Sequence, residues 1–162
     1  MSGSKNRPGE IAVEPDPAAT ATDAGLVFIG RIRSPWRSRE SCPKNIRKAR
    51  ETGKGATIEI DAPWRPGLVD IEPGMALVIL TWMHQARRDL VIQAPRHSAR
   101  VHGVFSIRSP VRPNPIGLGV VRCLAVDRQN GIVSIDAIDA LDGTPLIDIK
   151  PWLETTDIPP LI

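Results

Sequence analysis

The sequence has no tyrosine, only two phenylalanines and only two cysteines among its 162 residues. With so few aromatic side chains, the core has to be aliphatic, and an apolar content of 41% can supply it. Cys42 and Cys123 have no motif spacing, so neither a disulfide framework nor a zinc site is predicted. The longest apolar run, Met75–Leu80, is far too short to cross a membrane. Since no signal peptide is recognised, we expect a reduced, cytoplasmic setting and no membrane partner.

Long helices are not expected either, because 16 prolines and 13 glycines interrupt the chain. Short segments rich in β-branched residues lie between these breaks: Leu26–Ile32, Ala56–Ile60, Met75–Trp82, Val101–Ile107, Gly117–Val126, Ile132–Ile138 and Leu146–Ile149. About seven short strands with one or two short helices predict an all-β fold, a small β-barrel or a strongly curved sheet. The clearest helix candidate is Asn45–Thr52, which Gly53 would end.

The segment at residues 1–25 is rich in Ala, Thr, Pro and Asp and shows no apolar period. This composition is typical of a disordered chain. We therefore expect one β-barrel domain over residues 26–158, between a disordered N-terminal tail and a short C-terminal tail at residues 159–162. Within the domain, the Asn130-Gly131 pair predicts a hairpin turn.

Charge is unevenly distributed, although the formal net charge is only +3. Nine bases and two acids give Arg31–Lys54 a formal charge of +7, and six arginines in Met83–Arg112 are opposed only by Asp89. The segment Asp127–Ile162 is acidic instead, with seven acids and two bases. Two basic segments favour a polyanionic partner such as nucleic acid if they meet in space, and ordinary solvated surfaces are the alternative. Trp36 is a candidate platform for stacking an unpaired base.

A proline-rich loop, Arg108–Gly119, is the most distinctive segment. Three prolines in six residues fix φ and remove three backbone donors, and each also restricts the residue before it. A stiff loop that carries two arginines and Asn114 loses little entropy when it binds a partner. Its composition fits a binding surface and a plain connection between two strands equally well.

Other motifs are less specific. Gly117-Leu118-Gly119 is not followed by a helix pattern, which argues against a dinucleotide site. The three histidines have no paired short spacing, so no metal site is expected. Two segments could either contact a ligand or simply end a strand or form a turn: Trp82-Met83-His84-Gln85 and Leu141–Pro145.

Five segments, taken in order, resemble one family: Met83-His84-Gln85, Phe105–Pro110, Arg112–Leu118, Leu141–Pro145 and Asp148–Trp152. They are similar to the TsaA-like (YaeB/TrmO) family of S-adenosylmethionine-dependent tRNA methyltransferases, over about residues 26–158. Its best-understood members methylate N6 of the threonylcarbamoyladenosine beside the anticodon. The resemblance implies a β-barrel enzyme that uses S-adenosylmethionine, binds the anticodon stem-loop of tRNA and forms a homodimer.

The resemblance also implies which residues bind the cofactor: Pro43, Lys44, Asn45, His84, Gln85, Arg108, Leu118, Asp142, Gly143 and Thr144. Arg108 or the backbone amides near Gly143 could hold the carboxylate of the cofactor, and Asp142 could accept a hydrogen bond from its amino group or ribose. The candidates for substrate binding are Arg112, Asn114, Arg37 and Arg47. No catalytic residue is assigned, but His84 is the candidate general base because its type titrates near neutral pH.

Two other classes of protein remain open at this point. A methyltransferase with a non-tRNA substrate would keep the cofactor residues without needing the clustered positive charge of Arg31–Lys54. A non-catalytic module that binds the cofactor or RNA would keep the fold and show no turnover.

Overall fold

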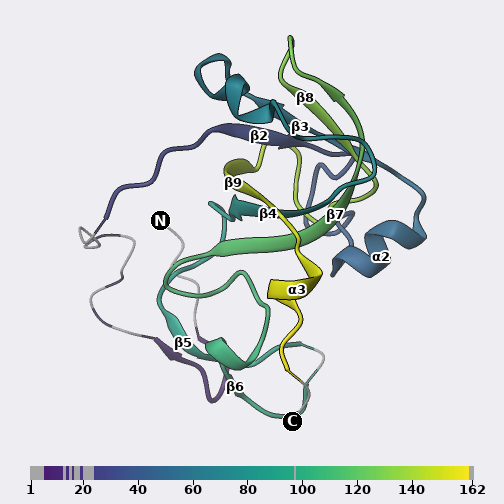
Figure 1. Ribbon diagram of the computed structural model, residues 1–162. Coiled ribbons are helices and arrows are strands. Elements are labelled where there is room, and N and C mark those ends of the chain that lie inside the picture. The colour runs from purple at the N-terminus through teal and green to yellow at the C-terminus, as the bar shows by residue number, and fades with distance from the viewer. Residues whose placement is uncertain are drawn as a thin grey trace. The chain divides into compact units, whose positions relative to one another are not determined.

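The computed structural model describes residues 6–12, 14, 16, 19, 24–96 and 98–160 (Figure 1). Much of the expected N-terminal tail, residues 161–162 of the expected C-terminal tail, and His97 lie outside the described residues. The chain divides into two compact units. Unit 1 comprises Met1–Gly25 and Met83–Ile116, and unit 2 comprises Leu26–Trp82 and Gly117–Ile162.

Unit 2 contains a closed β-barrel of six strands, in the order β2-β3-β8-β7-β4-β9 (Figure 1). These strands are β2 Gly30–Arg33, β3 Ala56–Ile60, β4 Ala76–Trp82, β7 Ile116–Asp127, β8 Ile132–Ile135 and β9 Pro145–Pro151. The pairings β2-β3, β3-β8, β8-β7 and β4-β9 are antiparallel. The all-β barrel is therefore confirmed, with six barrel strands instead of about seven.

The barrel interior is aliphatic, as the composition predicts. Alternate residues of β3 and β4 point inwards, so that Ile58, Ile60, Leu77 and Ile79 are buried between less buried neighbours. The Met75–Leu80 run is continuously apolar, yet every second residue of β4 remains partly exposed. This strand lies in the barrel wall, with one face outside the core.

Three short helical segments occur among the described residues of unit 2. Helix α2 (Ile46–Glu51) confirms the predicted helix, and Asn45 begins it because its Oδ1 accepts a hydrogen bond from the Lys48 backbone N at 2.9 Å. A 3-10 helix, η1 (Ala62–Leu68), contains Pro66. A four-residue helix, α3 (Glu154–Asp157), follows the last strand.

Close backbone approach explains the glycine at the start of β2. A Cβ atom built on Gly30 would lie 1.9 Å from the backbone oxygen of Glu59. Strand β2 pairs with both β3 and β9 at this residue, so no side chain fits between the strands.

Unit 1 contains a three-stranded sheet in the order β1-β5-β6, formed by Ile11–Ala12, Leu90–Gln93 and His102–Gly103. Strand β1 belongs to the segment expected to be a disordered tail, so this described part of the segment pairs in a sheet. The strand expected over Val101–Ile107 is only two residues long. It ends where a 3-10 turn, η2 (Val104–Ser106), begins, because Ser106 Oγ donates to the Gly103 carbonyl at 2.8 Å.

Candidate functional site

Backbone hydrogen bonds fix the Asp142-Gly143-Thr144 turn of unit 2. Three amides donate within the protein: Asp142 to Trp36 O at 2.8 Å, Gly143 to Ile32 O at 2.8 Å and Thr144 to Leu141 O at 3.1 Å. Gly143 has φ of 78°, a left-handed conformation that glycine adopts without strain. These amides already have acceptors within the protein, which argues against their holding the carboxylate of the cofactor. The turn instead fixes the position of Asp142.

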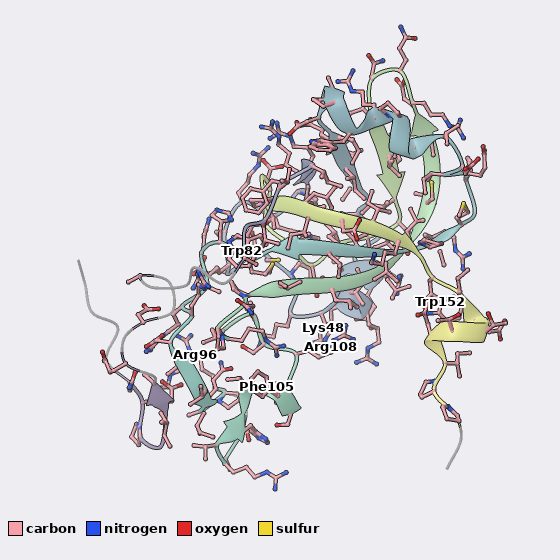
Figure 2. All side chains as sticks on the ribbon, turned by 60° about the vertical axis from the view of Figure 1, so that its left-hand side comes forward. Lys48, Trp82, Arg96, Phe105, Arg108 and Trp152 are labelled. Atoms are coloured by element: carbon pink, nitrogen blue, oxygen red, sulfur yellow. The ribbon has the colours of Figure 1, made fainter. Side chains whose placement is uncertain are left out.

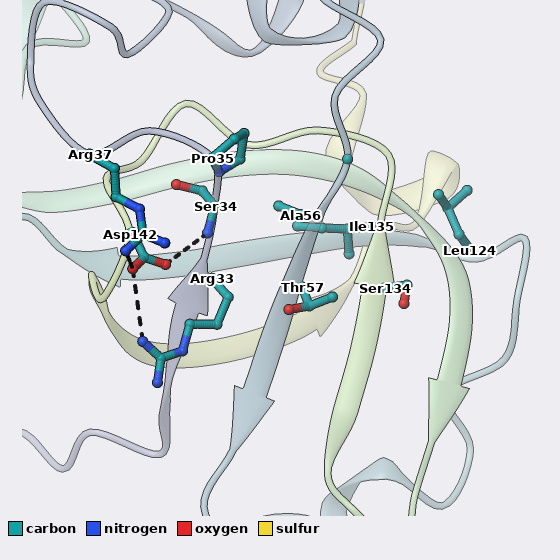
Figure 3. A pocket seen from close by; sticks show the side chains of 11 residues that line it. Arg33, Ser34, Pro35, Arg37, Ala56, Thr57, Leu124, Ser134, Ile135 and Asp142 are labelled. Carbon is teal, nitrogen blue, oxygen red and sulfur yellow. Dashed lines mark hydrogen bonds and ion pairs between the residues drawn. The ribbon is translucent and has the colours of Figure 1, made fainter.

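The carboxylate of Asp142 is held by one backbone amide and two arginines (Figure 3). Its Oδ1 accepts from the Ser34 backbone N at 3.2 Å, and its Oδ2 lies 2.7 Å from Arg37 Nη1 and 3.9 Å from Arg33 Nη1. The side chain of Asp142 is 15% exposed, whereas that of Arg37 is 80% exposed. Asp142 is thus a positioned anion at the edge of solvent, and its closest charged partner lies almost entirely in water.

An open cleft of about 670 Å³ adjoins Asp142 (Figure 3). One row of residues crosses three strands beneath it, because Arg33 pairs with Thr57 and Thr57 pairs with Ser134. These side chains face outwards, since their neighbours Ile58 and Val133 are buried in the core. The volume lies in the range that is usual for small-molecule sites.

The sequence alone does not identify this row of cleft residues. Alternation along β3 marks Thr57 as outward-facing, but the register that places it between Arg33 and Ser134 is a tertiary property. Of the ten predicted cofactor residues, only Asp142 lines the cleft. Of the four predicted substrate-binding residues, only Arg37 lines it.

In unit 1, hydrogen bonds join the His84-Gln85 turn to the proline loop. Met83 N donates to the Pro115 carbonyl at 2.8 Å, and Arg88 Nε donates to the Pro113 carbonyl at 2.6 Å. Ala86 N closes the turn by donating to the Met83 carbonyl at 2.8 Å, and His84 and Gln85 are exposed at its tip. The structure therefore brings together two segments that the sequence treats as parts of one site.

Arg112 fixes the proline loop through hydrogen bonds from its guanidinium. Its Nε donates to the Ser109 carbonyl at 2.8 Å, and its Nη2 donates to the carbonyls of Val104, at 2.8 Å, and Ile107. Three carbonyls thus share one partly buried guanidinium. Arg108 and Asn114, in the same loop, are exposed.

The remaining predicted residues of unit 2 have varied surroundings. Leu118 is 50% exposed on β7, and Arg47 is 80% exposed on α2. Asn45 caps α2 through its amide oxygen, directly after Pro43 and Lys44. The capping bond gives Asn45 a structural role of its own.

Trp36 does not have the role that the sequence suggests for it. Only 6% of its surface is exposed, and its indole Nε1 donates to the Ile138 carbonyl at 2.7 Å. A ring buried in this way has no face open to an incoming base, so the prediction of a stacking platform at Trp36 is wrong.

The fold pairs much of the basic segment with acids from elsewhere in the chain. The closest pairs are Arg50 with Asp136 at 2.6 Å, Arg37 with Asp142 at 2.7 Å and Arg33 with Glu59 at 2.9 Å. Asp136 and Asp142 belong to the acidic segment 127–162. The separation of charge along the sequence is therefore partly cancelled within unit 2.

Neither cysteine is suited to nucleophilic chemistry. Burial, with a smaller contribution from Asp139, raises the pKa of the Cys42 thiol to about 11, and burial also raises the pKa of Cys123. In the part of the chain that the structure describes, no group of His, Cys, Asp or Glu side chains is arranged to hold a metal ion. None of the helices within the described ranges has the length and apolar character needed to span a membrane.

Comparison with known proteins shows which family and which relatives this chain resembles. The chain matches the family described as the tRNA-methyltransferase O N-terminal domain over residues 31–158. It is 42% identical over 152 residues to the probable S-adenosyl-L-methionine-binding protein VirR of Rhizobium radiobacter, covering 93% of this chain and 82% of VirR. It is 38% identical over 129 residues to an S-adenosyl-L-methionine-binding protein of Archaeoglobus fulgidus, covering 80% of this chain and 89% of that protein.

A solved structure agrees with the fold. A crystal structure of TrmO from Pseudomonas aeruginosa matches with a TM-score of 0.67 and 30% sequence identity. The match covers 86% of this chain and 59% of the TrmO chain, so this chain spans less than two thirds of the length of that relative.

Proposed function

Since the chain belongs to the tRNA-methyltransferase O N-terminal domain family, we propose that it is an S-adenosylmethionine-dependent methyltransferase acting on tRNA. The observation that carries the proposal is the family match over residues 31–158, which includes both the proline loop and the Asp142 turn. Relatives named as S-adenosyl-L-methionine-binding proteins support the cofactor. A putative S-adenosylmethionine-dependent methyltransferase of Pseudomonas aeruginosa, RcsF, is 35% identical over 140 residues and supports the reaction class.

The donors and acceptors of this chain suit that cofactor. S-adenosylmethionine supplies an electrophilic methyl group on a sulfonium centre. The Asp142 carboxylate, fixed by its turn beside the open cleft, accepts hydrogen bonds from the amino group or from the ribose hydroxyls. Because the amides of the turn already donate to carbonyls, Arg108 remains the proposed donor to the carboxylate of the cofactor.

Two tasks of the reaction fall to residues of this chain. They hold the acceptor nitrogen in line with the methyl group, and they accept the proton that the nitrogen loses. His84 is the proposed proton acceptor, because a neutral imidazole nitrogen can accept a proton. Its turn is closed by the Ala86–Met83 hydrogen bond and tied to Pro115, so its backbone is positioned in unit 1.

The proposed methyl acceptor is N6 of threonylcarbamoyladenosine beside the anticodon. A polyanionic substrate is supported by the six arginines of residues 83–112 and by Arg37 and Arg47, whose side chains are each 80% exposed in the other basic segment. Arg37 and Arg47 are proposed to contact phosphates of the anticodon stem-loop.

Transfer of a labelled methyl group from S-adenosylmethionine tests this proposal. Total tRNA is compared with tRNA that lacks the threonylcarbamoyl modification, and the products are digested and identified as nucleosides by mass spectrometry. We expect label only in the modified adenosine. Equal transfer to both tRNA pools would show that the methyl acceptor is another nucleoside. Tight cofactor binding without any transfer would identify a binding module instead of an enzyme.

A further inference from the structure

Phe105 is the most exposed of the large apolar side chains in the described residues. It leaves 86% of its surface open to solvent, in the η2 turn of unit 1 (Figure 2). Single exposed apolar residues are common on protein surfaces. The proposal therefore rests on how the backbone at Phe105 is held and on the charge of the segment that contains it.

The backbone is held on both sides of Phe105 by one side chain. Arg112 Nη2 donates to the carbonyl of Val104, the residue before Phe105, and to that of Ile107, two residues after it. Ser106 Oγ closes the same turn by donating to Gly103 O at 2.8 Å. Phe105 therefore extends from a fixed turn and has only two side-chain torsions to restrict on binding, so its entropy cost is small.

The segment around Phe105 is strongly basic. Residues 83–116 contain six arginines and a single acid, Asp89, which is paired with Arg87 at 2.5 Å. Arg96, Arg100 and Arg108 are exposed. A symmetric contact between two copies would place this basic segment against itself. A nucleic acid instead supplies both the phosphates for the arginines and a flat partner for the ring.

We propose that Phe105 is a stacking platform for an unpaired base of the RNA substrate, with neighbouring arginines binding the phosphates. The inference rests on the proposed function in taking that RNA to be the anticodon arm of a tRNA. Unpaired loop bases are the usual targets of aromatic side chains in RNA recognition. Phe105 thus offers an exposed aromatic ring, whereas the ring of Trp36 is buried.

Binding of the full chain to a synthetic anticodon stem-loop RNA tests this role, with 2-aminopurine as an unpaired loop base. Phe105→Leu keeps an apolar side chain but has no aromatic face, whereas Phe105→Trp keeps the face. We expect Phe105→Leu to weaken RNA binding roughly 5- to 100-fold and to remove the protein-induced fluorescence change. Phe105→Trp should retain both. Because no charge is lost, the salt dependence of binding should keep its slope in every variant.

Val69→Ala is the matched control, since Val69 is 66% exposed and lies in unit 2. Phe105→Gln serves as a second non-aromatic variant, and melting temperatures verify folding. Unchanged RNA affinity in both non-aromatic variants overturns the stacking role and leaves the proposed function standing. Absence of RNA binding by the wild type overturns both. If the wild type sediments as a dimer and the non-aromatic Phe105 variants sediment as monomers, Phe105 lies in a contact between copies and its stacking role is overturned.

Discussion

Replacing Asp142 with Asn tests whether its carboxylate mainly contacts the cofactor or mainly forms a structural ion pair. The amide has nearly the same shape and can still accept from the Ser34 backbone N, but it removes the charge that faces Arg37 and Arg33. Since the Arg37 side chain is 80% exposed and Arg33 lies 3.9 Å away, the lost ion pairing costs only about 0.2–1 kcal/mol of stability.

The expected loss in cofactor affinity is larger. A hydrogen bond to a charged group contributes about 1.5–3 kcal/mol, and more when its partner is left unsatisfied. For S-adenosylmethionine this corresponds to a roughly 10- to 150-fold increase in Kd. Titration calorimetry measures the affinity, and urea denaturation of the same preparation measures the free energy of unfolding.

Arg37→Gln is the matched companion, because it breaks the same ion pair and leaves the Asp142 carboxylate charged. We expect it to leave cofactor affinity unchanged or slightly higher, while binding of tRNA weakens. The reasoning is refuted if Asp142→Asn binds the cofactor as the wild type does. A loss of several kcal/mol in stability would likewise show that the carboxylate is mainly structural.

Three further predictions follow from other parts of the molecule. His84→Gln should lower the rate of methyl transfer by roughly 100-fold or more at saturating cofactor and tRNA, with an unchanged melting temperature, and a rate near that of the wild type would exclude a general base there. Gly30→Ala should destabilise the barrel strongly in denaturant titration, because its Cβ would lie 1.9 Å from the Glu59 carbonyl oxygen, whereas Gly67→Ala, with nothing within 4 Å, should not. The hydrogen bond from Arg87 lowers the pKa of Asp89 below its ordinary value of 3.8, so Asp89 contributes stability above that pH and loses the contribution as pH falls through the lowered folded pKa. The stability difference between wild type and Asp89→Asn should therefore narrow as pH falls below 3.8, and a difference that does not depend on pH would contradict this origin.

Features that depend on local chemistry could be predicted from the sequence. The alternation through Ile58 and Ile60 marks a strand with one buried face, and Asn45 marks the start of a helix through its capping bond. Val101–Ile107 shows where local composition misleads. Its β-branched residues favour a strand, but the Ser106–Gly103 hydrogen bond closes a turn instead.

Features that depend on long-range pairing could not be predicted in this way. Arg37 and Asp142 lie 105 residues apart and meet only because the turn is fastened to β2. The row beneath the cleft depends on strand register, which no local pattern specifies. The buried indole of Trp36 donates its hydrogen bond to the carbonyl of Ile138, 102 residues away.

The pairing of basic and acidic segments in unit 2 has a consequence for selectivity. Carboxylates such as Asp136 and Asp142 occupy arginines in the way that phosphates would, so they compete with any polyanionic ligand for these arginines. A phosphate that binds Arg50 or Arg37 competes with the carboxylate already paired there, so a diffuse polyanion such as heparin gains little net binding energy at these arginines. A ligand that also fills specific contacts can offset that cost. The internal carboxylates therefore favour a polyanion that makes additional specific contacts over one that is only negatively charged.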